Sequence, residues 1–228
     1  MKRLTSVVRG RSLCCTLRDL CRPMPTPLSV AVRIRPRLYR DGEGKTTEDT
    51  TVVGNQIAVA GQPNEYAFTQ TFGSDASQVS VYQHCAAPQV AAVLEGFDAC
   101  VFAFGQTGAG KTYSMIGLEG GRSQAQDGIL PLAAAEIFRT VAQLSAAESC
   151  QYRLSATFVE VHREGVFDLL ATQRTKVGVR EADEGAVVDG ATILRIRSVD
   201  GLLRAVSKGV HDRGPNSTRH LSVAPLLC

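Results

Sequence analysis

The chain has 228 residues, and its 44% hydrophobic content is enough apolar material to form the core of one large α/β domain or two small ones. Residues 1–24 carry a charge of +5, from six basic residues and one acid, and the rest of the chain carries −2, which gives the net charge of +3. The seven cysteines form no C-x-x-C pair, which argues against a zinc site or a disulfide framework and predicts reduced thiols in a cytosolic protein. No apolar run approaches the roughly 18–20 residues of a membrane-spanning helix, so we expect a folded globular protein and no membrane segment.

Residues 1–27 predict a disordered basic tail. The stretch PMPTP at 23–27 keeps the chain extended and places the edge of the folded domain near Leu28. An arginine-rich segment with few acids is also compatible with a mitochondrial transit peptide, but a disordered tail is the interpretation we favour. The sequence therefore divides into a tail, 1–27, and a folded part, 28–228.

From residue 29, short apolar runs alternate with helical patterns, as is typical of a sheet flanked by helices. Residues 29–36 alternate apolar and polar side chains and predict a strand that Pro36 ends. A polar loop rich in glycine and threonine follows. Residues 56–61 and 65–72 then predict two strands joined by a short turn, which makes them a hairpin candidate.

The middle of the chain predicts two helical segments around one strand. Residues 76–95 have apolar side chains at helical spacing, and Pro88 predicts a break near Ala87. The run ACVFAF at 99–104 is continuously apolar and short, which predicts a central strand covered on both faces. Residues 131–148 begin with proline and repeat apolar side chains at helical spacing, so they predict a helix.

The last third predicts further strands and helices. Residues 151–161 predict a long strand, and 163–170 predict a short helix. Residues 176–190 predict a charged hairpin in which a Glu-Gly pair supplies the turn. Residues 198–210 predict a helix with a serine cap and a glycine near its end. The segment 221–228 resembles the beginning of another strand.

One motif carries chemistry. The sequence GQTGAGKT at 105–112 fits the pattern G-x-x-x-x-G-K-[ST] without a gap. In such a loop the glycines let backbone amides point at phosphate oxygens, and the start of the following helix adds its positive end. We expect Lys111 to reach the β- and γ-phosphates of ATP and the Thr112 hydroxyl to bind Mg²⁺. A preceding apolar strand and a helix starting at Lys111 are the context that separates this motif from a chance turn. The residues predicted to contact the nucleotide phosphates are Gly105, Gln106, Thr107, Gly108, Ala109, Gly110, Lys111 and Thr112.

The wider segment FDACVFAFGQTGAGKTYSM at 97–115 resembles the kinesin motor domain, whose members typically read F-A-Y-G-Q-T-G-S/A-G-K-T-Y-T-M there. Further similar blocks occur in the family's order: VRIRP at 32–36, TFGSDASQVSVY at 71–82, DGILPLAAAEIF at 127–138 and FVEVHREGVFDLL at 158–170. The resemblance covers about residues 28–213. It implies an α/β fold of the P-loop NTPase type, with a mixed sheet flanked by helices, in an ATP-driven microtubule motor.

By this resemblance, Arg35, Pro36 and Tyr113 would frame the adenine, because the base can lie against a proline and an aromatic face. From the residues alone, Pro36 ends a strand, and Arg33 and Arg35 are charges at a strand edge. Both interpretations remain open at this point.

The chain departs from the family pattern at several positions, among them Leu132, where the family usually has an arginine after the proline. His162 and Arg163 stand where tyrosine and asparagine are common, and we interpret both as tolerated changes at the surface or in packing. No cysteine or serine nucleophile is paired with His162 in the sequence, so a strand-end residue is a better interpretation than a catalytic base.

Hydrolysis needs groups that sense the γ-phosphate and place water. The sequence NSTRHLS at 216–222 resembles the first switch of the family, N-x-x-S-S-R-S-H, with Ser217, Thr218 and Arg219 in its central positions. It lacks the serine between arginine and histidine that by resemblance approaches Mg²⁺, so it is either an altered switch or a chance match. No D-x-x-G, the pattern of the second switch, follows Thr112. The resemblance thus implies a motor fold incomplete at its C-terminal side, with poor stability.

Two functions remain open from the sequence. The first is a kinesin-like motor fragment that binds ATP, Mg²⁺ and microtubules and supports microtubule-based movement in the cytoplasm, with its own hydrolysis impaired, so that enzyme activity is left undecided. The alternative is a non-catalytic truncated isoform that binds nucleotide or regulates another motor. In the family the hairpin at 176–190 faces acidic tubulin, but here it is rich in acids, which does not favour that partner. We expect no nucleic-acid or membrane partner, and the oligomeric state is not readable.

Overall fold

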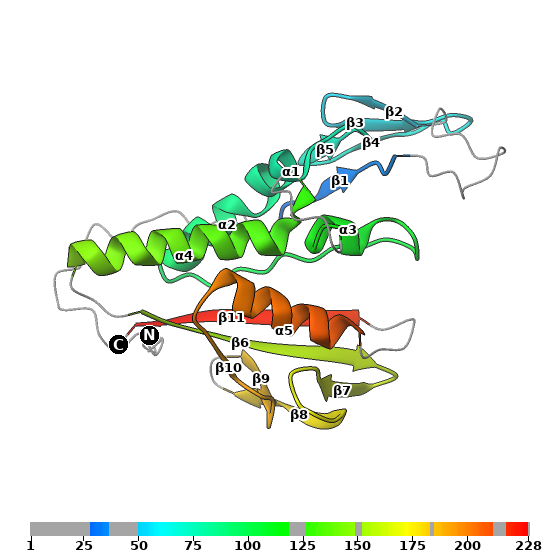
Figure 1. The fold of residues 1–228 in the computed structure, drawn as a ribbon. Helices are drawn as coiled ribbons and strands as arrows, with labels where there is room; N and C mark the ends of the chain where they lie inside the picture. The colour runs from blue at the N-terminus through cyan, green and yellow to red at the C-terminus, as the bar shows by residue number, and fades with distance from the viewer. Residues whose placement is uncertain are drawn as a thin grey trace, which may run out of the picture. The chain divides into compact units, whose positions relative to one another are not determined.

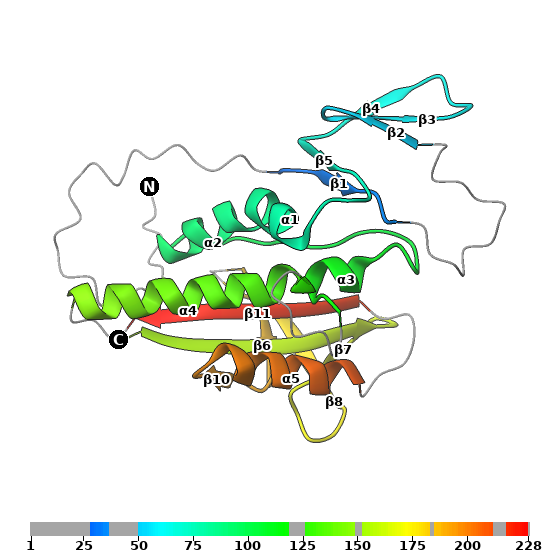
Figure 2. The same ribbon diagram turned by 45° about the horizontal axis from the view of Figure 1, so that its top comes forward.

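The structure is a computed structural model and describes residues 28–36, 50–118, 126–148, 152–182, 185–211 and 218–227. The predicted tail, 1–27, lies outside the described residues. The described chain forms two compact units, with the division between Glu136 and Ile137. Figures 1 and 2 label the elements from two directions.

The first unit contains two small sheets and a group of helices. Its elements are β1 (Ala31–Arg33), β2 (Thr50–Val53), β3 (Gln56–Val59), β4 (Glu65–Ala67), β5 (Gln70–Phe72), α1 (Gln78–Cys85), α2 (Ala87–Leu94), α3 (Lys111–Met115) and the start of α4 (Ile129–Glu148). The first strand and the hairpin of β3 and β4 confirm the prediction, and β2 joins them as an unpredicted third antiparallel strand. The predicted strand 65–72 is two strands, because β4 pairs with β3 whereas β5 pairs in parallel with β1.

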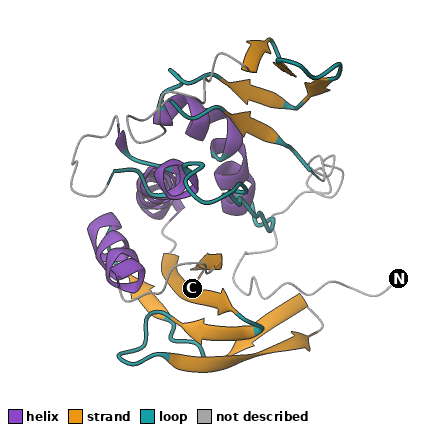
Figure 3. Cartoon of the chain, turned by 90° about the vertical axis from the view of Figure 1, so that its right-hand side faces the viewer, coloured by secondary structure: helices purple, strands orange, loops and turns teal. Residues whose placement is uncertain are grey.

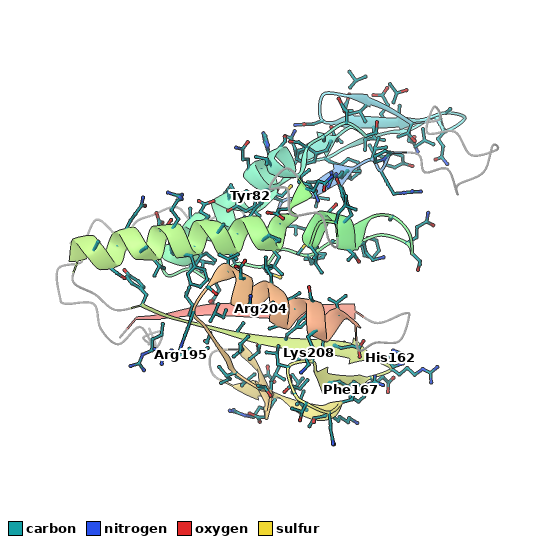
Figure 4. All side chains as sticks on the ribbon, in the orientation of Figure 1. Tyr82, His162, Phe167, Arg195, Arg204 and Lys208 are labelled. Atoms are coloured by element: carbon teal, nitrogen blue, oxygen red, sulfur yellow. The ribbon has the colours of Figure 1, made fainter. Side chains whose placement is uncertain are left out.

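The two helices after β5 confirm the predicted break. Ser77 caps α1 by accepting a hydrogen bond from the Ser80 amide at 3.1 Å, and Pro88 stands in the first turn of α2, where its missing N–H costs nothing. A core cluster forms where these helices meet β5 and α4: Phe72, Val81, Tyr82, Ala86 and Ile129. The Tyr82 hydroxyl donates to Glu136 of α4, and Figure 4 labels this tyrosine.

The predicted central strand at 99–104 is wrong for the described part of the chain, where no strand pairs with this segment. Phe102 is 72% exposed and Phe104 is 95% exposed. The physical reason is that an apolar run forms a buried strand only when neighbouring strands supply hydrogen bonds and covering helices bury its side chains. The segment therefore reaches the glycine loop as an irregular chain, of which Val101 packs against the core cluster.

The second unit is a larger sheet packed against one helix, and Figure 3 shows the sheet in orange with that helix in purple beside it. Its elements are β6 (Tyr152–His162), β7 (Gly165–Asp168), β8 (Thr175–Ala182), β9 (Gly185–Asp189), β10 (Leu194–Ile196), α5 (Val199–His211) and β11 (Thr218–Leu227). The sheet order is β10-β6-β7-β8-β9, and β11 also pairs with β6 along residues 152–161.

The long strand β6, the hairpin of β8 and β9, and α5 confirm the predictions for these segments. The Ser198 hydroxyl accepts from the Gly201 amide at 3.1 Å, which is the expected cap of α5. Leu202 and Val206 of this helix are buried, and Gly209 lies so close to Phe158 of β6 that an added Cβ would come within 3.0 Å of the ring. The glycine therefore allows the helix to pack closely on the sheet.

The predicted short helix at 163–170 is wrong, because residues 165–168 form β7 and pair with the end of β6. The tight turn between the two strands consists of Arg163, with φ 45°, and Glu164, with φ 61°. A left-handed pair is the two-residue turn that antiparallel strands prefer, although it normally contains asparagine and glycine. Because the turn lacks asparagine and glycine, the only pattern in the sequence was the spacing of Val166, Leu169 and Leu170. That spacing is compatible with one face of a helix, which is why a helix was predicted.

The helix α4 confirms the prediction for 131–148 and begins two residues earlier. It is also long and apolar enough over Ile129–Ala146 to cross a membrane, by length and composition only, with 11% of that window buried. Glu136 and Arg139 interrupt the apolar residues of this window, and the expectation of no membrane segment remains a prediction. Core helices of soluble proteins pass the same test.

Candidate nucleotide-binding site

The glycine loop 105–112 is an open turn that leads into α3. The Ala109 amide donates to the Gln106 carbonyl at 3.1 Å, which closes the turn. Gly108 and Gly110 have φ values of 84° and 95°, in the region that side chains disfavour. An added Cβ at Gly108 would meet no atom within 4 Å, so the restriction there comes from the backbone and not from crowding. As predicted, the helix begins at Lys111.

The Lys111 side chain folds back over this loop. Its ammonium donates to the carbonyl of Gly105 at 2.7 Å and to the carbonyl of Gln106 at 2.9 Å. These contacts hold a positive charge at the loop while using two of its three donor hydrogens. An anion entering the loop would meet a cation already in place.

Two of the three residues predicted to frame adenine lie beside the loop. The side chain of Arg35 lies near Gly110, since a Cβ added to that glycine would be 3.8 Å from Arg35 Cδ. Pro36 follows it in the chain and is exposed. Tyr113 is the third residue of α3 and is half-buried, with its ring 5.1 Å from the Arg33 guanidinium carbon.

A polar network under α3 was missed by the sequence reasoning. The Arg33 guanidinium donates to Gln78 Oε1 at 2.6 Å, to Ser114 Oγ at 3.0 Å and to the Ala76 carbonyl at 3.1 Å. Gln78, which is 2% exposed, in turn donates from Nε2 to the Tyr113 carbonyl at 2.6 Å. Arg33 lies in an edge strand, because β1 and β5 form a two-stranded sheet, but its guanidinium is half-buried and hydrogen-bonded. Gln78 belongs to the block TFGSDASQVSVY at 71–82 that carries the resemblance, but nothing in that block indicates its partners Arg33 and Tyr113.

The C-terminal end of α3 is fixed by a close backbone contact. Gly117 forms an isolated antiparallel bridge with Asp127, and the Gly128 amide donates to the Ile116 carbonyl at 3.1 Å. A Cβ on Gly128 would lie 2.6 Å from the Ile116 nitrogen, so only glycine fits there. Burial raises the pKa of the Asp127 carboxyl at this junction.

The remaining predicted residues are distributed as follows. Thr107 and Thr112 are exposed, the latter in the first turn of α3, where a hydroxyl is accessible to a phosphate-bound cation. Ser217 lies outside the described residues. Thr218 and Arg219 begin β11 in the second unit, where their backbones align with Val161 and Glu160 of β6.

A glycine loop that opens a helix and carries a lysine over its turn is typical of the P-loop class of nucleotide-binding folds, although the strand that normally precedes such a loop is not formed by residues 99–104 in the described part of the chain. The sequence profile of the kinesin motor domain matches residues 31–222. The chain belongs to the kinesin motor domain family, and this confirms the resemblance and the fold class inferred from the motifs.

Similar proteins carry the same family name. The chain is 32% identical over 199 residues to the mouse kinesin-like protein KIF27, an alignment that covers 85% of this chain and 14% of the relative. It is 30% identical over 209 residues to the human kinesin-like protein KIF21B, with 84% of this chain and 13% of the relative covered. For Klp68D of Drosophila melanogaster the identity is 28% over 195 residues, covering 82% and 24%. The chain thus spans a small part of the length of these relatives.

Proposed function

We propose that this chain binds ATP at residues 105–112 and that these 228 residues alone turn it over weakly or not at all. The observation that carries the binding proposal is the Lys111 ammonium, held over the loop by the carbonyls of Gly105 and Gln106. Membership of the kinesin motor domain family supports the choice of nucleotide. The proposed binding residues are those predicted from the sequence: Arg35, Pro36, Gly105, Gln106, Thr107, Gly108, Ala109, Gly110, Lys111, Thr112 and Tyr113.

Magnesium fits the donor set, because the exposed Thr112 hydroxyl is an oxygen ligand at the start of α3. When bound, Mg²⁺ neutralises charge on the phosphates. Lys111 would provide the second cation on the same phosphates, and the loop amides would supply hydrogen bonds. Binding should therefore weaken when the metal is chelated.

The proposal of weak turnover rests on the switch residues. The 228 residues contain no D-x-x-G after Thr112, and the candidate first switch lacks one serine of the family pattern. Thr218 and Arg219 also have their backbones in the ladder of β11 with β6, which supports a role in the sheet for these residues. ATP binding and ATP hydrolysis thus have different requirements. In our proposal the glycine loop and Lys111 meet those for binding, and the switch residues do not meet those for hydrolysis.

Microtubule binding, microtubule-based movement and a location on the cytoskeleton are proposals that rest on the family. The hairpin of β8 and β9 adds little to them, because Arg180 pairs with Asp189 of the same hairpin at 2.7 Å. A basic side chain that is already neutralised contributes weakly to an acidic tubulin surface. We therefore expect weak, salt-sensitive binding to microtubules.

The test combines two measurements on the full chain. Calorimetric titration with Mg-ATP should give one binding site, and EDTA should weaken it. Phosphate release should stay at background with and without microtubules. Absence of ATP binding would refute the first half of the proposal, and microtubule-stimulated phosphate release that disappears in Lys111→Ala would refute the second.

A second candidate function is regulation of another motor by a non-catalytic isoform. The exposed Phe102 and Phe104 favour it, because apolar side chains on an unpaired irregular segment are suited to contact another protein. Adding the chain to gliding assays of a full-length kinesin should then change the gliding speed. A Phe102→Ser, Phe104→Ser variant should have no such effect.

A further inference from the structure

The polar network under α3 has no role in the proposed phosphate contacts, yet it joins β1, α1 and α3 through side-chain hydrogen bonds. Gln78 is 2% exposed, and both ends of its amide are used. Its oxygen accepts from Arg33 at 2.6 Å, and its nitrogen donates to the Tyr113 carbonyl at 2.6 Å. A buried amide satisfied at both ends has one orientation, so it fixes the distance between β1 and α3.

Arg33 extends the same connection. Its guanidinium reaches α1 through Gln78, the segment before α1 through the Ala76 carbonyl, and α3 through the Ser114 hydroxyl. It also lies over the Tyr113 ring, with 5.1 Å from the guanidinium carbon to the ring centroid. A cation at this distance attracts the face of the ring and holds its plane. The backbone and the ring of Tyr113 are thus restrained by two different partners.

We propose that Gln78 and Arg33 are positioning residues that set the orientation of Tyr113 and thereby the preference of the site for the adenine base over the phosphates alone. This inference rests on the proposed nucleotide binding at 105–112. Arg33 holds one face of the Tyr113 ring, so the base would stack on the opposite face. Lys111 and the loop amides contact only phosphates, so they need no help from Gln78 to bind them.

Two substitutions separate positioning from general support of the fold. Gln78→Leu removes these two hydrogen bonds and a longer one from Nε2 to the Gln126 carbonyl at 3.5 Å, whereas Gln78→Glu keeps an acceptor for Arg33 and loses the donor to the Tyr113 carbonyl. The matched control is Gln83→Leu, which changes the same residue type on the exposed side of the same helix. Arg33→Lys keeps the charge and loses the forked geometry that reaches three acceptors.

The experiment measures dissociation constants of the full chain for Mg-ATP and for magnesium tripolyphosphate, which lacks base and sugar. Both variants lose the buried hydrogen bond to the Tyr113 carbonyl, and this shared loss predicts that Gln78→Leu and Gln78→Glu lower the ATP affinity by about tenfold. Tripolyphosphate affinity should change less than about threefold, because the loop contacts remain. Gln83→Leu should change neither constant.

The outcomes distinguish the two proposals. If the wild-type chain binds neither ligand, the proposed function fails. If it binds both, and the Gln78 variants keep the wild-type ratio of the two affinities, the positioning role fails. An equal loss for both ligands would also overturn it, since that result indicates support of the whole fold. Should Gln78→Leu not fold, Arg33→Lys provides the same comparison and must lower the ATP preference.

Discussion

Replacing Lys111 with alanine removes the ammonium that lies 2.7 Å from the Gly105 carbonyl and 2.9 Å from the Gln106 carbonyl. In the nucleotide complex this ammonium would exchange those contacts for phosphate oxygens. A hydrogen bond between charged partners contributes about 1.5–3 kcal/mol, which corresponds to roughly a ten- to hundredfold change in the dissociation constant. Because the two carbonyl contacts must be given up on binding, we expect a value near the lower end of that range.

The assay is an equilibrium titration with a fluorescent ATP analogue at constant ionic strength. The matched control is Lys208→Ala, which removes a lysine from the exposed face of α5 in the second unit. Circular dichroism should show the same helix content for both variants. If Lys111→Ala binds the nucleotide within about twofold of the wild type, the ammonium is not the phosphate contact and the reasoning from its position is wrong.

Three further predictions concern the local structure. Glu164→Gly should stabilise the chain by about 0.5–1 kcal/mol, because the turn holds Glu164 at φ 61°, a conformation that glycine adopts with less strain. The variant should have a higher urea midpoint, and an unchanged midpoint would contradict the turn assignment. Cys100 is exposed and should be alkylated faster than half-buried Cys85, whose thiol pKa is raised by burial. Peptide mass spectrometry measures both rates, and a protected Cys100 would mean that 99–104 is a covered strand. Asp168→Asn should lower the free energy of unfolding by about 1–3 kcal/mol, because the buried Asp168 carboxylate accepts hydrogen bonds from the Leu170 amide at 2.8 Å and the Thr192 amide at 2.7 Å. An unchanged urea midpoint would refute that role.

Where local sequence signals decide the structure, the sequence predicted it well. Pro88 separates α1 from α2, Ser198 begins α5, and the glycine loop ends where α3 starts at Lys111. Each of these features depends on a few neighbouring residues whose backbone preferences are strong. The long strand β6 was predictable for a similar reason, since its apolar pattern continues over many residues.

The wrong or missing predictions concern segments whose structure depends on residues far away in the sequence. Residues 99–104 have the composition of a central strand, but a strand needs neighbours, and the described chain pairs none with it. At 163–170 the hairpin is closed by Arg163 and Glu164, which lack the usual turn residues, so spacing alone favoured a helix. The connection of Gln78 to Tyr113 joins residues 35 apart and has no local signal.

One measurement tests the central claim most directly. The purified chain is incubated with Mg-ATP and microtubules, passed through a desalting column, and the nucleotide that remains bound is identified by chromatography. Our account predicts one ATP per chain that is still ATP after prolonged incubation. A chain recovered without nucleotide would contradict the proposed binding, and a chain recovered with ADP, together with released phosphate, would contradict the proposed lack of turnover.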